Sequence, residues 1–294
     1  MRPETRATYE ERILRVQSYL NERLDEEMRL EDLAGVACLS PFHFHRIFRG
    51  MTGETVAGYV RRLRMQRAAS QLKMSGRPVT EIALDAGYDS LEGFSRAFHE
   101  HYGSAPSAWR ETQPPRSQVA TPHEVRVVHR PAITAICLRH VGPYGDIGPV
   151  FGRLFEWAGR QGLLAGPFDT AGMPHDDPDV TPPEKIRCDA AILLGTQPRG
   201  PVALAGGPAG GPAGGPAGGN VRWMTLPERD YAVVRHTGPY ERLSDAYAWL
   251  CGVWLPRSGR EAASLPPLEF YRNHPPQTPL AQLVTDIHLP LEPA

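Results

Sequence analysis

A segment that begins near Leu33 returns, in a closely similar form, near Ile82, and this tandem repeat constrains the fold of the chain most. Each copy has a short apolar stretch, a serine, an aromatic-rich stretch and then a glycine, over residues 33–53 and 82–103. That order is the sequence form of a helix-turn-helix. Two such units in one polypeptide can read two adjacent major-groove segments of double-stranded DNA. The sequence therefore predicts an all-α, DNA-binding N-terminal domain.

The second helix of the first unit has an inner and an outer face. Ser40 is placed to cap it, and Pro41 suits the first helical position, where a missing N–H costs nothing. Successive residues advance by about 100°, so Phe44, Ile47 and Phe48 share the face that packs inward. The outer face offers a phenyl ring, an imidazole and two guanidiniums, groups that suit base edges, phosphates and thymine methyls. We therefore predict DNA contacts from Phe42, His45, Arg46 and Arg49.

The second unit has the same spacing of cap, inward-facing and outward-facing residues. Asp89 or Ser90 caps its second helix, Gly87 fits the left-handed end of the helix before it, and Phe94 with Phe98 faces inward. The predicted DNA-facing residues here are Glu92, Ser95, Arg96 and His99.

The two units are joined by residues 56–73, which read as one long helix with basic residues along its exposed side. Between Pro41 and Arg77 the basic residues outnumber the single acid, Glu54, by eight to one. Such a run serves either as a phosphate-facing surface or as a solvated helix face. Arg46 and Arg96 likewise either contact DNA or pair with an acid inside the domain.

Ahead of the first unit, Thr8 and Glu11 predict a capping box and a helix that starts there.

The C-terminal half contains a second repeat. The run RHVGPY at 139–144 returns as RHTGPY at 235–240, with an alternating strand before each copy and a helix with aromatic residues after it. A duplicated strand–helix–strand unit that buries one sheet face under helices predicts an α+β domain. Two pseudo-symmetric halves leave a groove between them, a favoured place for a small ligand. Gly-Pro-Tyr itself is typical of a turn that starts a helix.

Composition sets outer limits on the function. The formal net charge of the 294 residues is −1, so any nucleic-acid contact depends on local basic character. The four cysteines are far apart and read as reduced apolar residues, and the histidine spacings do not favour a metal site. We expect no cofactor and no metal. The polar start and the lack of a long apolar stretch predict a cytoplasmic protein without membrane contact.

Residues 8–112 resemble the DNA-binding domain of the AraC/XylS regulators. The resemblance rests on the runs IALDAGYDS at 82–90, FSRAF at 94–98 and GSAPSAWR at 103–110. It implies that residues 42, 45 and 46 of the first unit, and 92, 95 and 96 of the second, make base and backbone contacts. Glu92 departs from the neutral amides common in that family, and its carboxylate suits a cytosine amino group better than a phosphate.

Residues 123–292 resemble the GyrI-like effector-binding domain. The landmarks are the two RHxGPY runs, LEFY at 268–271 and TDIHLP at 285–290. The resemblance places Glu269 at the floor of a pocket for cationic, often aromatic, ligands, although the same residue could instead point to solvent. A carboxylate among aromatic rings favours a lipophilic cation through charge and cation–π attraction. Further lining candidates are Tyr271, Phe168, Trp223, Tyr144 and Tyr240.

Together these features predict a two-domain, ligand-responsive transcription regulator that is not an enzyme. The expected parts are an AraC-type domain at 1–112, a linker at 113–122 and a GyrI-like domain at 123–294, with a flexible Gly/Pro/Ala insertion at about 199–220. Its expected partners are double-stranded DNA and a small-molecule effector, with RNA polymerase as a further candidate. Two alternatives stay open for the C-terminal domain. One is a hydrolase of electrophilic compounds that uses Glu269 with Tyr144 or Tyr240, and the other is a protein-interaction module.

Overall fold

The computed structural model describes residues 3–112, 123–195, 221–263 and 265–293, and the chain divides into two compact units, residues 1–114 and 115–294. The predicted linker at 113–122 and the predicted insertion at 199–220 lie outside the described residues. Among the helices that are described, none combines the length and the apolar character needed to cross a bilayer.

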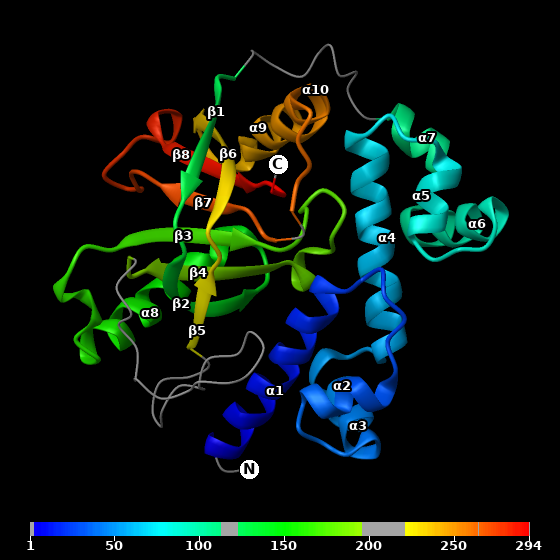
Figure 1. Ribbon diagram of the computed structural model, residues 1–294, viewed down its shortest axis with the longest axis horizontal. Helices are drawn as coiled ribbons and strands as arrows, with labels where there is room; N and C mark the ends of the chain where they lie inside the picture. Colours follow the sequence, from blue (N-terminus) through cyan, green and yellow to red (C-terminus); the bar gives the residue numbers. More distant parts are fainter. Residues whose placement is uncertain (1–2, 113–122, 196–220, 264, 294) are drawn as a thin grey trace. The chain divides into compact units, whose positions relative to one another are not determined.

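The first unit is all helical and contains the tandem repeat (Figure 1). Its helices are α1 (Pro3–Glu22), α2 (Leu30–Val36), α3 (Pro41–Thr52), α4 (Val56–Met74), α5 (Val79–Asp85), α6 (Leu91–Tyr102) and α7 (Pro106–Glu111). The helix-turn-helix pairs are α2–α3 and α5–α6. They lie toward opposite ends of the long helix α4, which was predicted almost to its exact bounds.

The start of α1 differs from its prediction. The helix begins at Pro3, so Thr8 lies inside it and is not an N-cap. Proline is favoured in a first helical turn, and no glycine or second proline separates residue 3 from residue 8. Because nothing in that stretch breaks a helix, the capping signal at Thr8 marks no boundary.

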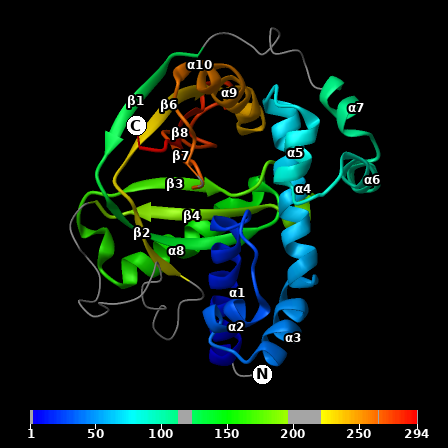
Figure 2. The same ribbon diagram turned by 45° about the vertical axis from the view of Figure 1, so that its right-hand side comes forward.

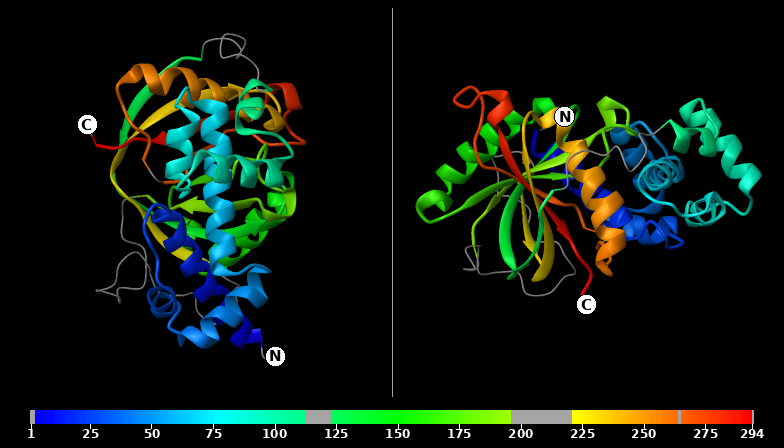
Figure 3. Two further views of the ribbon diagram at one scale, coloured as in Figure 1. Left: turned by 90° about the vertical axis from the view of Figure 1, so that its right-hand side faces the viewer. Right: turned by 90° about the horizontal axis from the view of Figure 1, so that it is seen from above.

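The second unit is built on an antiparallel sheet whose strand order is β1-β6-β8-β7-β3-β4-β2-β5. Its strands are β1 (Val125–Arg130), β2 (Ile133–Val141), β3 (Asp169–Pro174), β4 (Arg187–Leu193), β5 (Arg222–Leu226), β6 (Arg229–Thr237), β7 (Leu268–Tyr271) and β8 (Val284–Pro290). The sheet is strongly curled, as Figure 2 and the view from above in Figure 3 show. The strands β3 and β5 had no clear sequence signal.

The second unit consists of two similar halves, and the strand that precedes each half pairs with the other half. In one half, β2 leads into helix α8 (Gly148–Arg160), β3 and β4; in the other, β6 leads into α9 (Leu243–Trp249), β7 and β8. A π-helical turn and α10 (Leu255–Ser258) follow α9. The strand that precedes each half pairs with the other half, since β1 pairs with β6 and β5 pairs with β2. The halves meet where β3 pairs with β7, at Gly172 and Glu269. The α+β duplication predicted from the repeat is thus confirmed.

The sheet has two differently packed faces. On one face, α8 packs on residues such as Leu138 and Ala190, and α9 packs on residues such as Val234 and Ile287. Buried residues of the opposite face, among them Cys137, Met173 and Phe270, form a separate core cluster. Residues directly opposite each other on paired strands share a face. The helix-covered face therefore includes one row across the sheet: Val234, Ile287, Glu269, Gly172, Ala190 and Leu138.

Candidate functional sites

The two recognition helices, α3 and α6, have the same local construction. The hydroxyl of Ser40 accepts a hydrogen bond from the backbone of His43, and that of Ser90 accepts one from Gly93, so Ser90 and not Asp89 is the second cap. Gly53 and Gly103 end the helices with left-handed φ angles of 76° and 73°. Each helix therefore begins and ends on a signal that lies within its own sequence.

The inner faces of α3 and α6 also match. Phe44 and Phe48 are fully buried in α3, as are Phe94 and Phe98 in α6. Phe48 stacks edge-on against Tyr59 with ring centroids 5.5 Å apart. Its counterpart Phe98 lies 5.9 Å from the Trp109 ring. These contacts fix the rotation of each helix and thereby decide which residues face outward.

The predicted DNA-facing residues do lie on the outer faces. Phe42, Arg46 and Arg49 of α3 are exposed and His45 is half-buried; Glu92, Arg96 and His99 of α6 are exposed and Ser95 is half-buried. Phe42 is 62% exposed, and the Arg46 guanidinium lies over its ring at 4.4 Å. Within the described residues, neither Arg46 nor Arg96 forms an ion pair. The alternative in which these arginines pair with an acid of the domain is therefore not what the structure contains.

The basic residues of α4 were predicted to lie along its exposed side, and for three of them this prediction was wrong. Arg62 is buried, and its guanidinium donates three hydrogen bonds to the Glu54 carboxylate, the shortest at 2.8 Å. Arg64 and Arg67 are half-buried and bond to backbone and carboxylate groups of neighbouring segments. Arg61, by contrast, is exposed. Most of this run therefore stabilises the unit internally.

In the second unit, Glu269 lies in the centre of the helix-covered face and is only 7% exposed. Every other member of its row across the sheet is apolar or glycine. The hydroxyl of Tyr247 donates to one carboxylate oxygen and that of Tyr271 to the other, both at 2.8 Å. Burial raises the pKa of Glu269, although the two hydroxyl donors oppose that shift. The alternative in which Glu269 points to solvent is excluded.

Two further aromatic rings pack against Tyr271, one of the two donors to this carboxylate. The Tyr271 ring lies 5.3 Å from that of Tyr240 and 6.3 Å from that of Phe151, measured between centroids. Burial, and next the charge of Glu269, hold the pKa of Tyr247 and of Tyr271 well above the ordinary value, so both hydroxyls stay protonated donors. The arrangement offers a buried carboxylate bonded to two tyrosine hydroxyls, with further aromatic rings beside one of those tyrosines, and an acid among aromatic side chains favours an organic cation.

The remaining predicted lining residues lie at different distances from this centre. Tyr240 belongs to the ring group, and Tyr144 interacts electrostatically with Glu269. Phe168 contacts the Phe155 ring, and it lies four residues along the chain from Gly172, about 13 Å at strand spacing. Trp223 lies on β5, four strands away from β7 and so roughly 19 Å along the sheet. The structure therefore does not bring Phe168 and Trp223 to the carboxylate.

Two residues at the centre were missed as ligand candidates, Tyr247 and Phe151. They occupy equivalent positions on α9 and α8, each seven residues after the tyrosine of its Gly-Pro-Tyr run. Both looked like aromatic residues that anchor a helix to the sheet. Their equivalence across the repeat was the available signal, because a pseudo-twofold arrangement brings matching positions close to the line where the two halves meet.

The repeated RHxGPY motif itself has a structural role. Its tyrosine hydroxyls donate to backbone carbonyls, Tyr144 to Asp176 and Tyr240 to Asn273. Its histidines donate from Nε2 to the proline carbonyl three residues on, at 2.8 Å for His140. A short 3-10 turn follows each motif and leads into a helix, as predicted. Because Tyr144 and Tyr240 bond elsewhere, neither hydroxyl forms the pair with Glu269 that a hydrolase would use.

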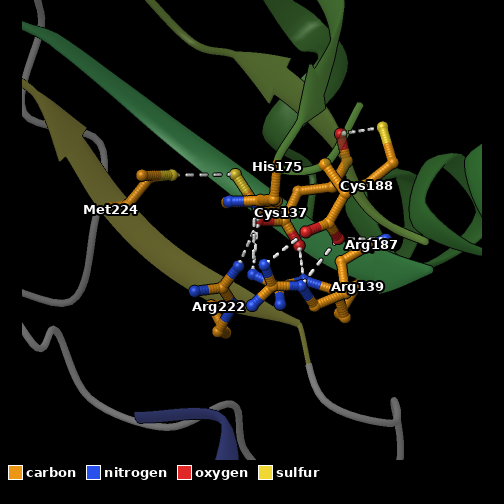
Figure 4. A network of polar contacts seen from close by, with 9 residues as sticks. Cys137, Arg139, His175, Arg187, Cys188, Arg222 and Met224 are labelled. Carbon is orange, nitrogen blue, oxygen red and sulfur yellow. Dashed lines mark hydrogen bonds and ion pairs between the residues drawn. The ribbon is translucent and has the colours of Figure 1, made fainter. Parts of the chain in front are cut away.

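The motif arginines complete two matching networks on the other sheet face. In the first half, the buried Asp189 accepts from Arg139 at 2.6 Å, and also from Arg222 and His175 (Figure 4). Burial would raise the pKa of Asp189, but the charges of Arg139 and Arg222 outweigh it and lower the pKa well below the usual value. Burial lowers the pKa of His175 to about 4, which leaves the ring neutral at pH 7.

In the second half, Asp286 accepts from Arg235 at 2.7 Å and from Arg272 at 2.8 Å. The hydrogen bond from Arg235 is the main reason that the pKa of Asp286 falls to about 2. Each network ties the β2 or β6 strand to its neighbour and so stabilises its half of the sheet.

Comparison with known proteins assigns both units. Residues 123–292 match the family described as a GyrI-like small molecule binding domain, and residues 33–112 match a helix-turn-helix domain. The uncharacterized HTH-type transcriptional regulator YbfP of Bacillus subtilis is 35% identical over 102 residues, which are 35% of each chain. The chain thus matches about a third of the length of that relative.

The regulatory protein SoxS of Escherichia coli is 32% identical over 93 residues, which are 32% of this chain and 87% of that one. The names of YbfP and SoxS are those of regulatory proteins, in line with the expectation that the chain is not an enzyme. Among solved structures, the C-terminal domain of EcmrR is 18% identical, with a TM-score of 0.41, and covers 59% of this chain and 100% of that one.

Proposed function

This chain belongs to the GyrI-like family of small-molecule binding domains and, through its N-terminal unit, to the AraC-type helix-turn-helix proteins that include SoxS; from that premise we propose that it is a ligand-responsive, sequence-specific transcription regulator. The N-terminal unit binds two adjacent major-groove segments, and the C-terminal unit binds an organic cation at Glu269. Ligand binding changes the affinity for DNA, and by linkage DNA changes the affinity for the ligand by the same factor.

The observation that carries the proposal is the pair of equivalent recognition helices. Each presents an exposed arginine at the same position, Arg46 in α3 and Arg96 in α6, that is held by no acid of the described residues. A guanidinium on such a face pairs bidentately with the O6 and N7 of guanine. Beside Arg46 the exposed Phe42 ring suits a thymine methyl, whereas beside Arg96 the Glu92 carboxylate suits a cytosine amino group. The two half-sites are therefore expected to differ in sequence.

The test of DNA recognition begins with a duplex selected by the full chain from a random-sequence pool. Arg46→Ala and Arg96→Ala should each weaken binding to that duplex by about 1–3 kcal/mol and relax the preference in one half-site only. Arg153→Ala, which removes an exposed helical arginine of α8, is the matched control and should bind as the wild type does. Unchanged affinity and unchanged sequence preference in both variants would rule out this docking.

The proposed ligand follows from the environment of Glu269. Its carboxylate is desolvated and is the only charge in its row across the sheet. Tyr247 and Tyr271 donate to it, and the rings of Tyr240 and Phe151 pack against Tyr271. A lipophilic cation gains both the charge attraction and contact with ring faces, whereas an anion meets repulsion in a medium that screens it poorly. We therefore assign a cationic or amphipathic aromatic compound to this site.

A permanently charged probe tests this assignment without interference from ligand ionisation. Tetraphenylphosphonium should raise the melting temperature of the wild type, and neutral triphenylphosphine oxide should do so less. Glu269→Gln keeps the shape and a hydrogen-bond acceptor, and should lose the difference between the two compounds. Equal stabilisation of wild type and variant by the cation would point to a neutral ligand, or to a protein-binding role for this unit.

Whether the effector changes DNA binding is tested by adding tetraphenylphosphonium to the protein together with the selected duplex. Tetraphenylphosphonium should change the affinity for the selected duplex in the wild type and not in Glu269→Gln. RNA polymerase is the further partner that we propose for the DNA-bound protein. Ternary complex formation on a promoter that carries the selected duplex is its test.

A further inference from the structure

Two arginines one turn apart on α4, Arg64 and Arg67, contact the turn between α1 and α2 on one side and the segment that joins α5 to α6 on the other. Arg64 and Arg67 project from the middle of the helix, between the end that carries α2–α3 and the end that carries α5–α7. The hydrophobic core around α1, α2 and α3 draws on residues 13–63 and does not extend to α5 or α6. The relative placement of the two units therefore depends on α4 itself and on what spans its flank.

On the side of the first helix-turn-helix, both arginines bond to the turn between α1 and α2. Arg64 donates from Nε to the carbonyl of Leu24 at 2.8 Å and from Nη2 to that of Glu26 at 3.4 Å. Arg67 forms a bidentate pair with the Asp25 carboxylate. The hydrogen bond from Arg67 is the main reason that the pKa of Asp25 is lowered. Three consecutive residues of this turn are thus bound to α4.

On the side of the second unit, the same guanidiniums reach the turn between α5 and α6. Arg67 donates from Nη2 to the carbonyl of Asp85 at 2.9 Å. The Arg64 guanidinium lies against Gly87, where an added Cβ would come within 2.7 Å of Nη1. Gly87 has a φ of +83°, a backbone conformation that favours glycine, and a side chain there would have to displace the Arg64 guanidinium. Asp85 is also bonded through its carboxylate to Arg77, at 2.7 Å.

From these contacts we infer that Arg64 and Arg67 form a clamp that fixes the distance and the angle between the recognition helices α3 and α6. Arginine suits this task because its planar fork can bond to several acceptors at once, in directions set by its own geometry. The two side chains are positioning residues and not DNA contacts. The inference rests on the proposed DNA-binding function, and it names what sets the spacing between the two half-sites.

The consequence for recognition is geometric. One base pair inserted between the half-sites moves the second by about 3.4 Å and turns it by about 34° around the duplex axis. A rigid pair of helices cannot follow that change without losing contacts in one half-site. A pair joined only through α4 can bend or twist to follow it. The loss of affinity on altered half-site spacing therefore shows whether the clamp holds the two helices, whereas the affinity for the correct spacing alone would not.

The variant that tests the clamp is Arg64→Met with Arg67→Met, which keeps the aliphatic stems and removes the bonds. Arg61→Met, at an exposed arginine of the same helix, is the matched control. Each protein is titrated with the duplex selected by the wild type and with duplexes that have one base pair added or removed between the half-sites. For each protein we compare its affinity for the duplex with the correct spacing to its affinity for a duplex with altered spacing. We expect this ratio to be roughly tenfold lower in the double variant than in the wild type. Arg61→Met should keep the wild-type ratio.

A measurement without DNA separates this inference from the proposed function. Spin labels on cysteines introduced at Gly50 and Glu100, which are exposed and equivalent positions of α3 and α6, report the distance between the helices. The accessible Cys38 and Cys251 are first replaced by serine. The distance distribution should broaden in the double variant and stay narrow in Arg61→Met.

An unchanged distribution, or an unchanged spacing ratio, overturns the clamp. If the wild type selects no DNA, the proposed function fails, and the label distances still decide whether the clamp exists. If the double variant does not fold, Arg67→Lys replaces it in both measurements, because lysine keeps the charge and loses the fork.

Discussion

Gly172 is the residue whose replacement tests the centre of the ligand site most directly. It faces Glu269 across the β3–β7 pair, and the Tyr271 side chain lies over it. A Cβ at this position would lie 3.1 Å from Cζ and 3.2 Å from Cε2 of Tyr271, and closer still to the hydroxyl oxygen. Because real Cβ contacts are longer, Gly172→Ala must displace the Tyr271 ring.

The cost has three parts. Overpacking in a well-packed region costs about 1–3 kcal/mol. Displacing the ring also breaks the 2.8 Å hydrogen bond from its hydroxyl to Glu269, and a bond to a charged group is worth about 1.5–3 kcal/mol. Replacing a strand glycine with alanine returns about 0.5–1 kcal/mol through chain entropy. We therefore expect Gly172→Ala to lower the free energy of unfolding by about 2–5 kcal/mol.

The assay is urea unfolding of the full chain, monitored by the fluorescence of the tryptophans, four of which lie in the second unit (Trp157, Trp223, Trp249 and Trp254). Gly152→Ala is the matched control, because that exposed position in α8 has nothing within 4 Å of an added Cβ. This change should stabilise the protein by about 0.5–1 kcal/mol.

A double-mutant cycle with Tyr271→Phe examines the mechanism. The phenylalanine lacks the hydroxyl, so the hydrogen bond to Glu269 is lost once and the closest clash is absent. The double variant should therefore be more stable than the sum of the single effects by about 1.5 kcal/mol or more. Additive effects within about 0.5 kcal/mol would refute the contact between Gly172 and Tyr271 as the cause.

Four further predictions concern charge and local structure. Because burial raises the pKa of Glu269, the affinity for tetraphenylphosphonium should fall as the pH drops through that raised pKa, and calorimetric titration at several pH values measures this. The same shift makes ionised Glu269 a cost to folding, so Glu269→Gln should be more stable than the wild type above that pKa and lose the advantage at lower pH in thermal melts. Glu54→Gln leaves Arg62 buried without its full charge partner and should destabilise the first unit by about 3 kcal/mol in urea unfolding, whereas a loss below about 1 kcal/mol would contradict this account. Ser40→Ala and Ser90→Ala should each cost about 1 kcal/mol, and a cap worth nothing in either would speak against the shared helix start.

Much of the first unit was predictable because its signals are local. The caps at Ser40 and Ser90, the left-handed glycines and the aromatic faces all act within one or two helical turns, where spacing in sequence determines position in space. The exposure of Arg46 and Arg96 followed from the same periodicity. The partners of the α4 arginines did not, since Arg67 bonds to Asp25 and Asp85, which lie far from it in the sequence.

In the second unit, the repeat predicted a duplicated α+β domain, and the resemblance to the GyrI-like domain placed the carboxylate of Glu269 in a pocket. The repeat did not predict the exchange of β1 and β5 between halves, nor the unmarked strand β3, because pairing between distant strands leaves little trace in local pattern. The motif RHxGPY drew attention to Tyr144 and Tyr240, yet their hydroxyls bond to backbone carbonyls.

The sequence alone thus determined the two kinds of domain, the outward faces of the recognition helices and the presence of a lone acid in an apolar strand. The tertiary structure decided that Tyr247 and Tyr271 donate to that acid, that Gly172 leaves room for one of them, and that two arginines of α4 bond to the α1–α2 turn and to the end of α5. The physical reason is the range of the interactions involved. Periodicity and capping act between near neighbours in the chain, whereas the surroundings of a buried charge depend on segments that only folding brings together.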